Sequence, residues 1–195
     1  SEEKLDMLQY CVQTLTERGY VFIGMDHFAK PDDELSIALK EGFLQRNFQG
    51  YSTYADCDLV AIGVSSIGKI GSTYSQNERD IDAYYAALDA GHLPIMRGYQ
   101  LNQDDILRRN IIQDLMCRFS LDYQIYESVF GIPFSRYFAA ELEDMKQLET
   151  LGLVRLKPHS LTVTPKGRFL IRNIAMVFDY HLRHKETKAK YSQTV

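Results

Sequence analysis

Residues 19–35, GYVFIGMDHFAKPDDEL, contain parts of two different elements. The apolar run over residues 20–25 predicts a buried strand, and Pro31 followed by acidic residues predicts the first turn of a short helix. Before this stretch, apolar residues recur at helical spacing over residues 5–15, and Gly19 can end that helix in a left-handed conformation. The sequence therefore predicts a helix–strand–helix unit at the start of the chain.

A second unit is predicted further along. Residues 58–64, DLVAIGV, form a near-continuous apolar run, which is typical of a strand covered on both faces. A helix is expected over residues 77–90, with four residues buried: Ile81, Tyr84, Tyr85 and Leu88. Alternating strands and helices favour a parallel α/β arrangement over residues 1–100. Because two strands make a poor sheet, we expect them to be the last strands of a larger barrel or sheet.

From Asn102 onward the pattern is mainly helical. Asn102 can cap a helix, and helical periodicity returns over residues 123–130 and 135–151. Residues 152–163 predict a short hairpin, which is followed by a helix with Pro165 at its first position. This order of elements gives a winged-helix-like outline and a second domain over residues 101–195.

The composition is that of an ordinary globular protein, with 45% hydrophobic and 25% charged residues. No apolar run is long enough to span a bilayer and no signal peptide opens the chain, so we expect a cytoplasmic protein. The net charge of −4 hides a basic end, because residues 155–195 hold nine lysines and arginines against two acidic residues. That end could contact nucleic acid, or it could dock on the acidic remainder of the chain.

Residues 61–72, AIGVSSIGKIGS, nearly match a Walker-type phosphate-binding loop. Gly63, Gly68 and Lys69 fit the pattern, but Ile70 stands where a hydroxyl should bind Mg²⁺, so a nucleotide hydrolase is excluded. Three glycines could still bring backbone N–H groups close to an adenosine or amino-acid ligand. A tight turn without a ligand explains them as well, and Lys69 is then an ordinary surface cation.

Two further stretches could form a binding site. Asp26 and His27 follow the first strand, where barrel enzymes place functional groups, although a hydrogen-bonded pair without substrate contact is an equal alternative. Residues 46–53, RNFQGYST, combine a cation, an amide and two aromatic rings. Such a loop could stack on a planar or sulfonium ligand and bind its carboxylate. From composition alone, an aromatic loop that plugs the mouth of a barrel is favoured.

No metal site is predicted. Cys11, Cys57 and Cys117 are widely spaced, so each is expected to be a small buried hydrophobe. His181 and His184 could share one face of a helix near Asp179, but no further ligand completes a set, and a solvated helix end is the better interpretation.

Five segments in a fixed order carry a family resemblance: residues 19–35, 46–53, DLVAIGVSSIG (58–68), DDILRRNIIQDLMC (104–117) and LTVTPKGRFLIRNIAMVFD (161–179). Together they resemble the C-terminal part of the oxygen-independent coproporphyrinogen III oxidase family, which consists of radical S-adenosylmethionine enzymes of heme synthesis. The related heme chaperones typically have Ser-Asn in place of Asp26-His27, with a Trp nearby. This chain has no Trp, so the oxidase is favoured over the chaperone.

The resemblance implies the last βα units of an incomplete (β/α) radical-SAM barrel, followed by a mostly helical, winged-helix-like domain. The family binds S-adenosylmethionine and a [4Fe–4S] cluster, whose CxxxCxxC motif does not occur in this sequence. The chain is therefore expected to be a C-terminal fragment that is inactive alone and is completed by the N-terminal barrel portion. The whole enzyme would convert two propionates of coproporphyrinogen III to vinyl groups, as a monomer without membrane contact.

The resemblance also suggests site residues. Phe48, Gln49 and Ile67 match family positions associated with a second S-adenosylmethionine and the substrate pocket. Asp26, His27 and Arg46 have no firm role in the family. They are second-rank pocket candidates, because a tetracarboxylate substrate needs cations and hydrogen-bond donors nearby. No catalytic residue is assigned in this chain.

A different class of function remains open. The hairpin outline and the basic charge of residues 135–195 are compatible with a winged-helix nucleic-acid-binding module. Both features are common in domains that bind no DNA, so nucleic acid is an unlikely partner.

Overall fold

The computed structural model describes residues 2–54 and 57–184. Its first part contains four elements: α1 (Glu2–Glu17), β1 (Val21–Gly24), β2 (His27–Ala29) and α2 (Glu34–Glu41). Gly19, with φ of 85°, follows α1, and Asp33 caps α2 by accepting a hydrogen bond from the Leu35 backbone N–H. The predicted helix–strand–helix unit is confirmed, with β2 added as an antiparallel partner of β1.

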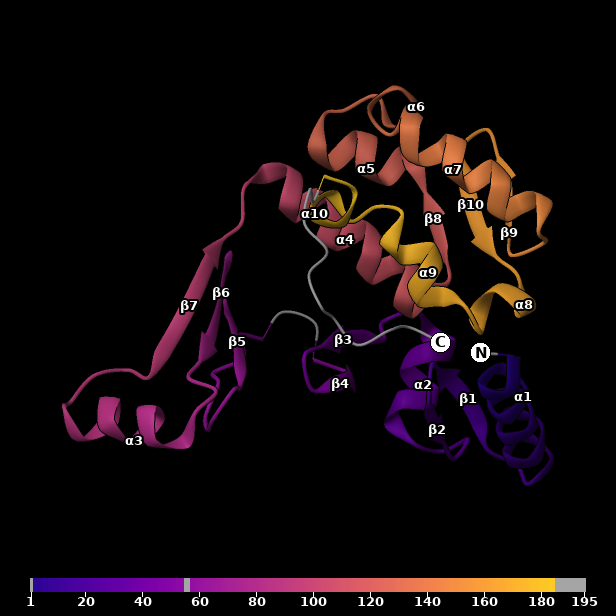
Figure 1. Cartoon of the computed structure of the whole chain (residues 1–195). Coiled ribbons are helices and arrows are strands. Elements are labelled where there is room, and N and C mark those ends of the chain that lie inside the picture. The colour runs from indigo at the N-terminus through magenta and orange to yellow at the C-terminus, as the bar shows by residue number, and fades with distance from the viewer. Residues whose placement is uncertain (1, 55–56, 185–195) are drawn as a thin grey trace.

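The middle of the chain is built from hairpins. Its elements are β3 (Gln45–Asn47), β4 (Gly50–Ser52), β5 (Ile67–Ile70), β6 (Thr73–Asn77), α3 (Ile81–Asp89) and β7 (Ile95–Gln100). β3 pairs with β4, while β5, β6 and β7 form a separate three-stranded sheet in that order. In Figure 1 this sheet and α3 stand apart from the helical part of the molecule.

Several expectations for this region are wrong. Every strand pairing in the described ranges is antiparallel, so the parallel arrangement is not found. Residues 58–64 contribute only an isolated bridge between Leu59 and Lys69, and Ile62 is 84% exposed. The predicted helix is present as α3 but buries none of its residues. Sequential hairpins pair neighbouring strands locally, which leaves the apolar run outside the sheet.

The second half of the chain is mainly helical, as predicted. It consists of α4 (Gln103–Arg118), β8 (Ser120–Asp122), α5 (Tyr123–Phe130), α6 (Phe134–Tyr137), α7 (Ala139–Thr150), β9 (Val154–Lys157), β10 (Ser160–Val163), α8 (Pro165–Arg168), α9 (Ile171–Met176) and α10 (Tyr180–Arg183). Asn102 caps α4 in a reciprocal capping box with Asp105. The predicted hairpin is β9–β10, and β8 joins it as a third strand beside β10.

One hydrophobic core joins the first helix–strand–helix unit to the helical second half of the chain. Leu107, Ile111 and Leu115 of α4 belong to the same buried cluster as Ile23 of β1 and Ala38 of α2. Within the described ranges, no helix is both long enough and apolar enough to cross a membrane. The core fixes the first unit against α4, and α4 is therefore the element that positions the neighbouring hairpins.

Candidate functional site

A cleft of about 720 Å³ lies among the β3–β4 hairpin, the β5–β6 hairpin, α4 and α5. Its volume is in the range of small-molecule and cofactor sites. The lining residues that matter below are Arg46, Phe48, Lys69, Tyr74, Arg109 and Val129. Three separate parts of the chain thus meet around one cavity.

Two hydrogen bonds seat the β3–β4 hairpin on α4. The Tyr51 hydroxyl donates to the backbone carbonyl of Met116 at 3.2 Å, and the side-chain amide of Gln113 donates to that of Gln45 at 2.8 Å. Burial is the main reason that the pKa of Tyr51 is raised to about 12. The phenol therefore stays protonated and acts as a fixed donor to the helix.

Arg46 and Arg109 line the cleft from β3 and α4. The Arg46 guanidinium lies 5.9 Å from the centre of the Tyr51 ring. Arg46 Nε and Arg109 Nη1 are buried, and each lacks a hydrogen-bond partner among the residues that the structure describes. The second-rank candidate Arg46 therefore reaches the cavity, together with an arginine that the sequence did not single out.

Two of the three residues matched to the cofactor, Phe48 and Ile67, each contact β6. Phe48 is 51% exposed, lines the cleft and packs edge-to-face against Tyr74 of β6, with ring centres 5.3 Å apart. Ile67 begins β5, where it pairs with Gln76 of β6 and is half-buried. Ile67 is not part of the cleft lining.

Gln49 occupies the tip of the β3–β4 hairpin. Its backbone N–H donates to the Asn47 side chain at 2.8 Å, while its own side chain is exposed. Gln49 does not line the cleft among the described residues. Its amide faces solvent beside Phe48, where it could reach a bound molecule only from the rim.

Asp26 and His27 form a pair beside Tyr51. Asp26 Oδ1 and His27 Nδ1 are 2.8 Å apart, and the His27 ring packs edge-to-face on Tyr51 with centres 5.1 Å apart. Neither residue lines the cleft. Asp26 instead borders a smaller hollow of about 210 Å³ between α1 and α9. The structure therefore separates this pair from Arg46 and Phe48.

Backbone groups of the glycine-rich stretch, residues 61–72, form hydrogen bonds with side chains of neighbouring segments. The Gly63 N–H donates to the Tyr84 hydroxyl and the Gly71 N–H donates to the Asp58 carboxylate. The Asn77 amide donates to the Gly63 carbonyl at 3.0 Å. Since these backbone groups are already paired, the stretch offers no ready cradle for an anion. Lys69, expected to be an ordinary surface cation, is half-buried in β5 and lines the cleft.

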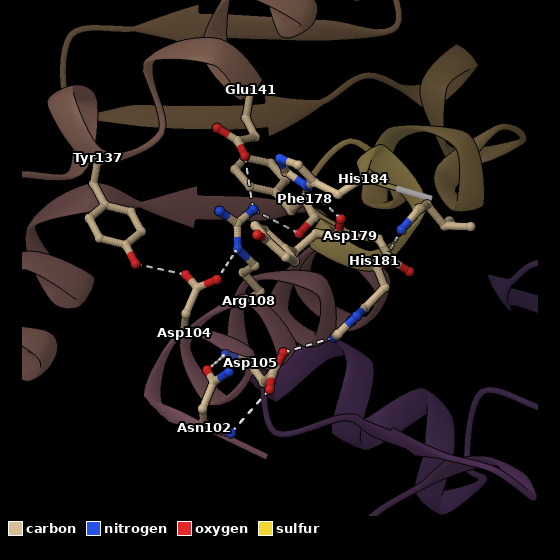
Figure 2. Close-up of polar contacts among 12 residues, drawn as sticks. Asn102, Asp104, Asp105, Arg108, Tyr137, Glu141, Phe178, Asp179, His181 and His184 are labelled. Carbon is tan, nitrogen blue, oxygen red and sulfur yellow. Dashed lines mark hydrogen bonds and ion pairs between the residues drawn. The ribbon is translucent and has the colours of Figure 1, made fainter. Parts of the chain in front are cut away.

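The polar residues near the end of the described chain cap a helix and link helices to each other. Asp179 caps α10, and His181 Nε2 lies 3.0 Å from Asp105 Oδ1 (Figure 2). Tyr99 donates to the other oxygen of Asp105, which also accepts from the Asn102 backbone. The helix end is solvated as expected, since α10 buries none of its residues, but His181 also joins α10 to the start of α4. The sequence did not single out Asp105.

Arg108 forms a second polar centre beside Asp105 (Figure 2). Its guanidinium bonds the carboxylates of Asp104 and Glu141, both at 2.8 Å, and the carbonyl of Phe178 at 3.2 Å. Arg108 is buried, and these bonds from Nε and Nη1 tie α4 to α7 and to the backbone at Phe178, so its main role is to join helical segments.

Metal ligands do not gather within the described parts of the chain. Over residues 2–54 and 57–184, no three His, Cys, Asp or Glu side chains are grouped so as to hold a metal ion. Cys117 is buried as predicted, but Cys11 and Cys57 are exposed, so the prediction of three buried cysteines is wrong for two of them. The donor set described here therefore does not fit an iron–sulfur cluster.

Comparison with known proteins gives one consistent family. Residues 101–170 match the family model described as the HemN C-terminal domain. Over 199 residues the chain is 48% identical to the oxygen-independent coproporphyrinogen III oxidase of Synechocystis sp., covering 100% of this chain and 43% of that protein. The Escherichia coli oxidase is 46% identical over 194 residues, with 100% and 42% covered.

A solved structure shares the fold. It is coproporphyrinogen III oxidase (HemN) from Escherichia coli, described as a radical SAM enzyme, and it matches with a TM-score of 0.88 at 47% identity. The match covers 93% of this chain and 42% of that one, which confirms the expected α/β and helical fold class. In sequence and in fold, the chain corresponds to the C-terminal part of the oxygen-independent coproporphyrinogen III oxidase family and spans about two fifths of its members' length.

Proposed function

We propose that this chain is the C-terminal part of an enzyme that oxidatively decarboxylates two propionates of coproporphyrinogen III and yields protoporphyrinogen IX. The observation that carries the proposal is the 46–48% identity to oxidases of that name over 100% of the chain. Residues 1–100 would supply the end of the barrel and pocket loops, and residues 101–195 a helical domain. We further propose a cytoplasmic, monomeric enzyme.

The residues beside the cleft are suited to bind S-adenosylmethionine but not the [4Fe–4S] cluster. Phe48, exposed and supported by Tyr74, would cover an adenosine or a methyl group, with Gln49 at the rim as donor and acceptor and Ile67 on the neighbouring hairpin. When bound, S-adenosylmethionine and a reduced [4Fe–4S] cluster supply the radical that removes hydrogen from a propionate. The cluster's ligands would belong to the N-terminal barrel portion, since the donors described here do not gather.

The chain's own contribution would be to bind and orient the substrate. Arginine and lysine side chains at the cleft would hold carboxylates, and the apolar residues of α5 would exclude water from the ring. Asp26 and His27 remain second-rank candidates, because neither residue lines the cleft.

An anaerobic assay tests the proposal. The gene product that contains these residues would be reconstituted with iron, sulfide, S-adenosylmethionine and a low-potential reductant, and protoporphyrinogen IX would be measured after oxidation to the porphyrin. Conversion is expected. Stable heme binding without conversion would refute the proposal and favour a heme chaperone.

A chimera gives a second test. This chain would replace the matching C-terminal part of the Escherichia coli oxidase, to which it is 46% identical over 194 residues. The chimera is expected to form protoporphyrinogen IX, and the unmodified oxidase prepared alongside serves as the positive control. A folded, cluster-loaded chimera with no activity would count against a shared function.

A further inference from the structure

Two arginines at the cleft are left without acceptors. Arg46 Nε and Arg109 Nη1 are buried nitrogens with no hydrogen-bond partner over the described ranges. A buried guanidinium nitrogen without an acceptor costs free energy, because the water that it loses is not replaced. Both arginines also line the cleft, so each brings a positive charge without an ion-pair partner among the described residues to its wall.

Other arginines in the chain do find acceptors. Arg108 bonds two carboxylates and a carbonyl, and Arg183 pairs with Asp144. Arg168, which also has an unpartnered nitrogen, still donates to the carbonyls of Phe22 and Ile23 and lies away from the cleft. By contrast, neither Arg46 nor Arg109 forms an ion pair with any described residue.

The carboxylates that line the cleft are already engaged. Asp114 accepts from the Tyr126 hydroxyl at 2.5 Å and pairs with Arg118 at 3.2 Å. Asp58 accepts from the Gly71 N–H at 2.8 Å. Lys69 adds a third cation to the wall, again without an ion pair among the described residues. The lining therefore carries a net positive charge, because its four cations, Arg46, Lys69, Arg109 and Arg118, outnumber the two carboxylates.

The part of the cleft wall formed by α5 includes apolar side chains. Ile125 and Val129 stand one helical turn apart on α5, are 53% and 69% exposed, and both line the cleft. Phe48 lies at the rim and Phe130 extends the same wall. A ligand that satisfies both the cations and these apolar side chains has a broad apolar body and more than one peripheral anionic group.

We propose that Arg46 and Arg109 form a carboxylate-binding pair for a tetrapyrrole carrying several carboxylates, with Lys69 as a third cation. This inference rests on the proposed function for the identity of the ring, but it adds Arg109 and Lys69, which the sequence did not propose as carboxylate ligands. Arg109 belongs to the helical half of the chain and Arg46 to the hairpin half. The ligand would thus be held between the two.

Binding of a stable porphyrin tests the pair directly. Coproporphyrin III would be titrated into the full chain by fluorescence, and coproporphyrin III tetramethyl ester, which keeps the ring and removes the charges, would be titrated with matched co-solvent. Arg46→Gln and Arg109→Gln are each expected to weaken binding of coproporphyrin III, the free acid, about tenfold or more, because each removes a charge-assisted hydrogen bond. The ester is expected to bind weakly and equally to all variants.

Two controls keep the result specific. Arg155→Gln removes an exposed arginine on β9 outside the cleft and is expected to leave affinity unchanged. Arg46→Lys, which retains the charge, is expected to recover part of the affinity and confirms that the hairpin has folded. Raising the salt concentration is expected to weaken binding of the acid to the unmodified chain more than to either Gln variant.

The outcomes separate this inference from the proposed function. The carboxylate pair is overturned if the unmodified chain does not bind coproporphyrin III, or if it and both Gln variants bind with equal affinity. The proposed function would then depend on the decarboxylation assay alone. If instead the Gln variants lose binding while the gene product makes no protoporphyrinogen, the pair stands and the proposed reaction fails.

Discussion

The hydroxyl of Tyr51 occupies the space that a side chain at Gly24 would fill. A Cβ built on Gly24 would collide with the Tyr51 oxygen and lie 3.2 Å from its Cζ. The same hydroxyl donates to the Met116 carbonyl of α4. The missing side chain at the end of β1 therefore allows the β3–β4 hairpin, which carries Arg46, to be seated on α4.

Replacing Gly24 with Ala should destabilise the chain by at least roughly 1–3 kcal/mol, because overpacking of a filled site adds to the backbone strain of a side chain at a φ of 158°. The measurement is the free energy of unfolding in urea. Gly98→Ala is the matched control, because the nearest atom to a Cβ at Gly98, the Tyr74 carbonyl oxygen, is 3.4 Å away. A loss at Gly24 no larger than that at Gly98 would contradict the contact.

The collision involves an oxygen that can be removed. Tyr51→Phe should lower stability by itself, since the hydrogen bond to Met116 is lost. In the Gly24→Ala background the same change should cost less or be favourable, because it relieves the collision. Additive effects in this double-mutant cycle would mean that the two residues do not interact.

Arg108 and Glu141 should be strongly coupled. Their side chains are 11% and 7% exposed, and the pair at 2.8 Å joins α4 to α7. Arg108→Ala should cost about 3–5 kcal/mol, because it leaves Glu141 as a buried charge without its partner. Urea unfolding of the two single variants and the double variant gives the coupling energy.

An exposed pair on α7 provides the contrast. Lys146 and Glu143 are 2.6 Å apart but 64% and 66% exposed, so Lys146→Ala should change the free energy of unfolding by about 0–1 kcal/mol. Equal losses for the exposed and the buried pair would show that burial does not determine the contribution of the Arg108 network.

The carboxylate of Asp105 should make stability depend on pH. Burial raises its pKa, but hydrogen bonds from the Asn102 backbone, Tyr99 and His181 outweigh burial and bring the pKa below its ordinary value of 3.8. Since the folded-state pKa is the lower one, this contribution is fully present above the unfolded pKa and is lost as the pH falls through the folded value.

Asp105→Asn tests this directly. The unmodified chain should lose stability more steeply than the variant between pH 5 and the acid limit of folding, and the two should converge there. Asp32→Asn, at an exposed position, is the matched control and should leave the slope unchanged. Parallel pH profiles for the unmodified chain and Asp105→Asn would remove Asp105 as the source.

Local signals in the sequence predicted much of the fold and less of the site. The cap at Asn102, the helix over residues 123–130 and the hairpin before Pro165 depend on neighbouring residues, and all three are present. The sheet order was missed because β6, with the sequence TYSQN, lacks apolar alternation. Its pairing with β5 and β7 is supported by hydrogen bonds from the side chains of Gln76 and Asn77 to backbone groups of residues 61–65.

The two arginines show why the site was only partly predictable. Arg46 was a candidate because its loop combines aromatic and polar residues, whereas Arg109 sits beside Arg108 in a charged helix. Only packing determines that Arg108 turns to Glu141 and that its neighbour lines the cleft. Phe48, Gln49 and Ile67 came from the family resemblance, and their roles remain predictions.

Thiol reactivity should divide the three cysteines. Cys11 and Cys57 are exposed, whereas burial raises the pKa of Cys117 from 9.0 to about 12, and the nearby Arg46 charge only partly opposes this. At pH 8 the Cys117 thiolate fraction should therefore be about a thousandfold below that of a thiol with a pKa of 9. In Ellman's assay, two thiols should react quickly in the folded chain and the third only after unfolding.

The Cys117→Ser variant identifies the slow thiol, because it should retain both fast thiols and lose only the one released by denaturant. Cys11→Ser should instead lose one fast thiol. Cys117 follows Met116, whose carbonyl accepts the Tyr51 hydrogen bond. The slow reaction of the Cys117 thiol therefore also reports whether the β3–β4 hairpin is packed on α4. Gly24→Ala should accelerate the slow thiol if the hairpin lifts from α4, and an unchanged rate in that variant would show that the hairpin stays in place.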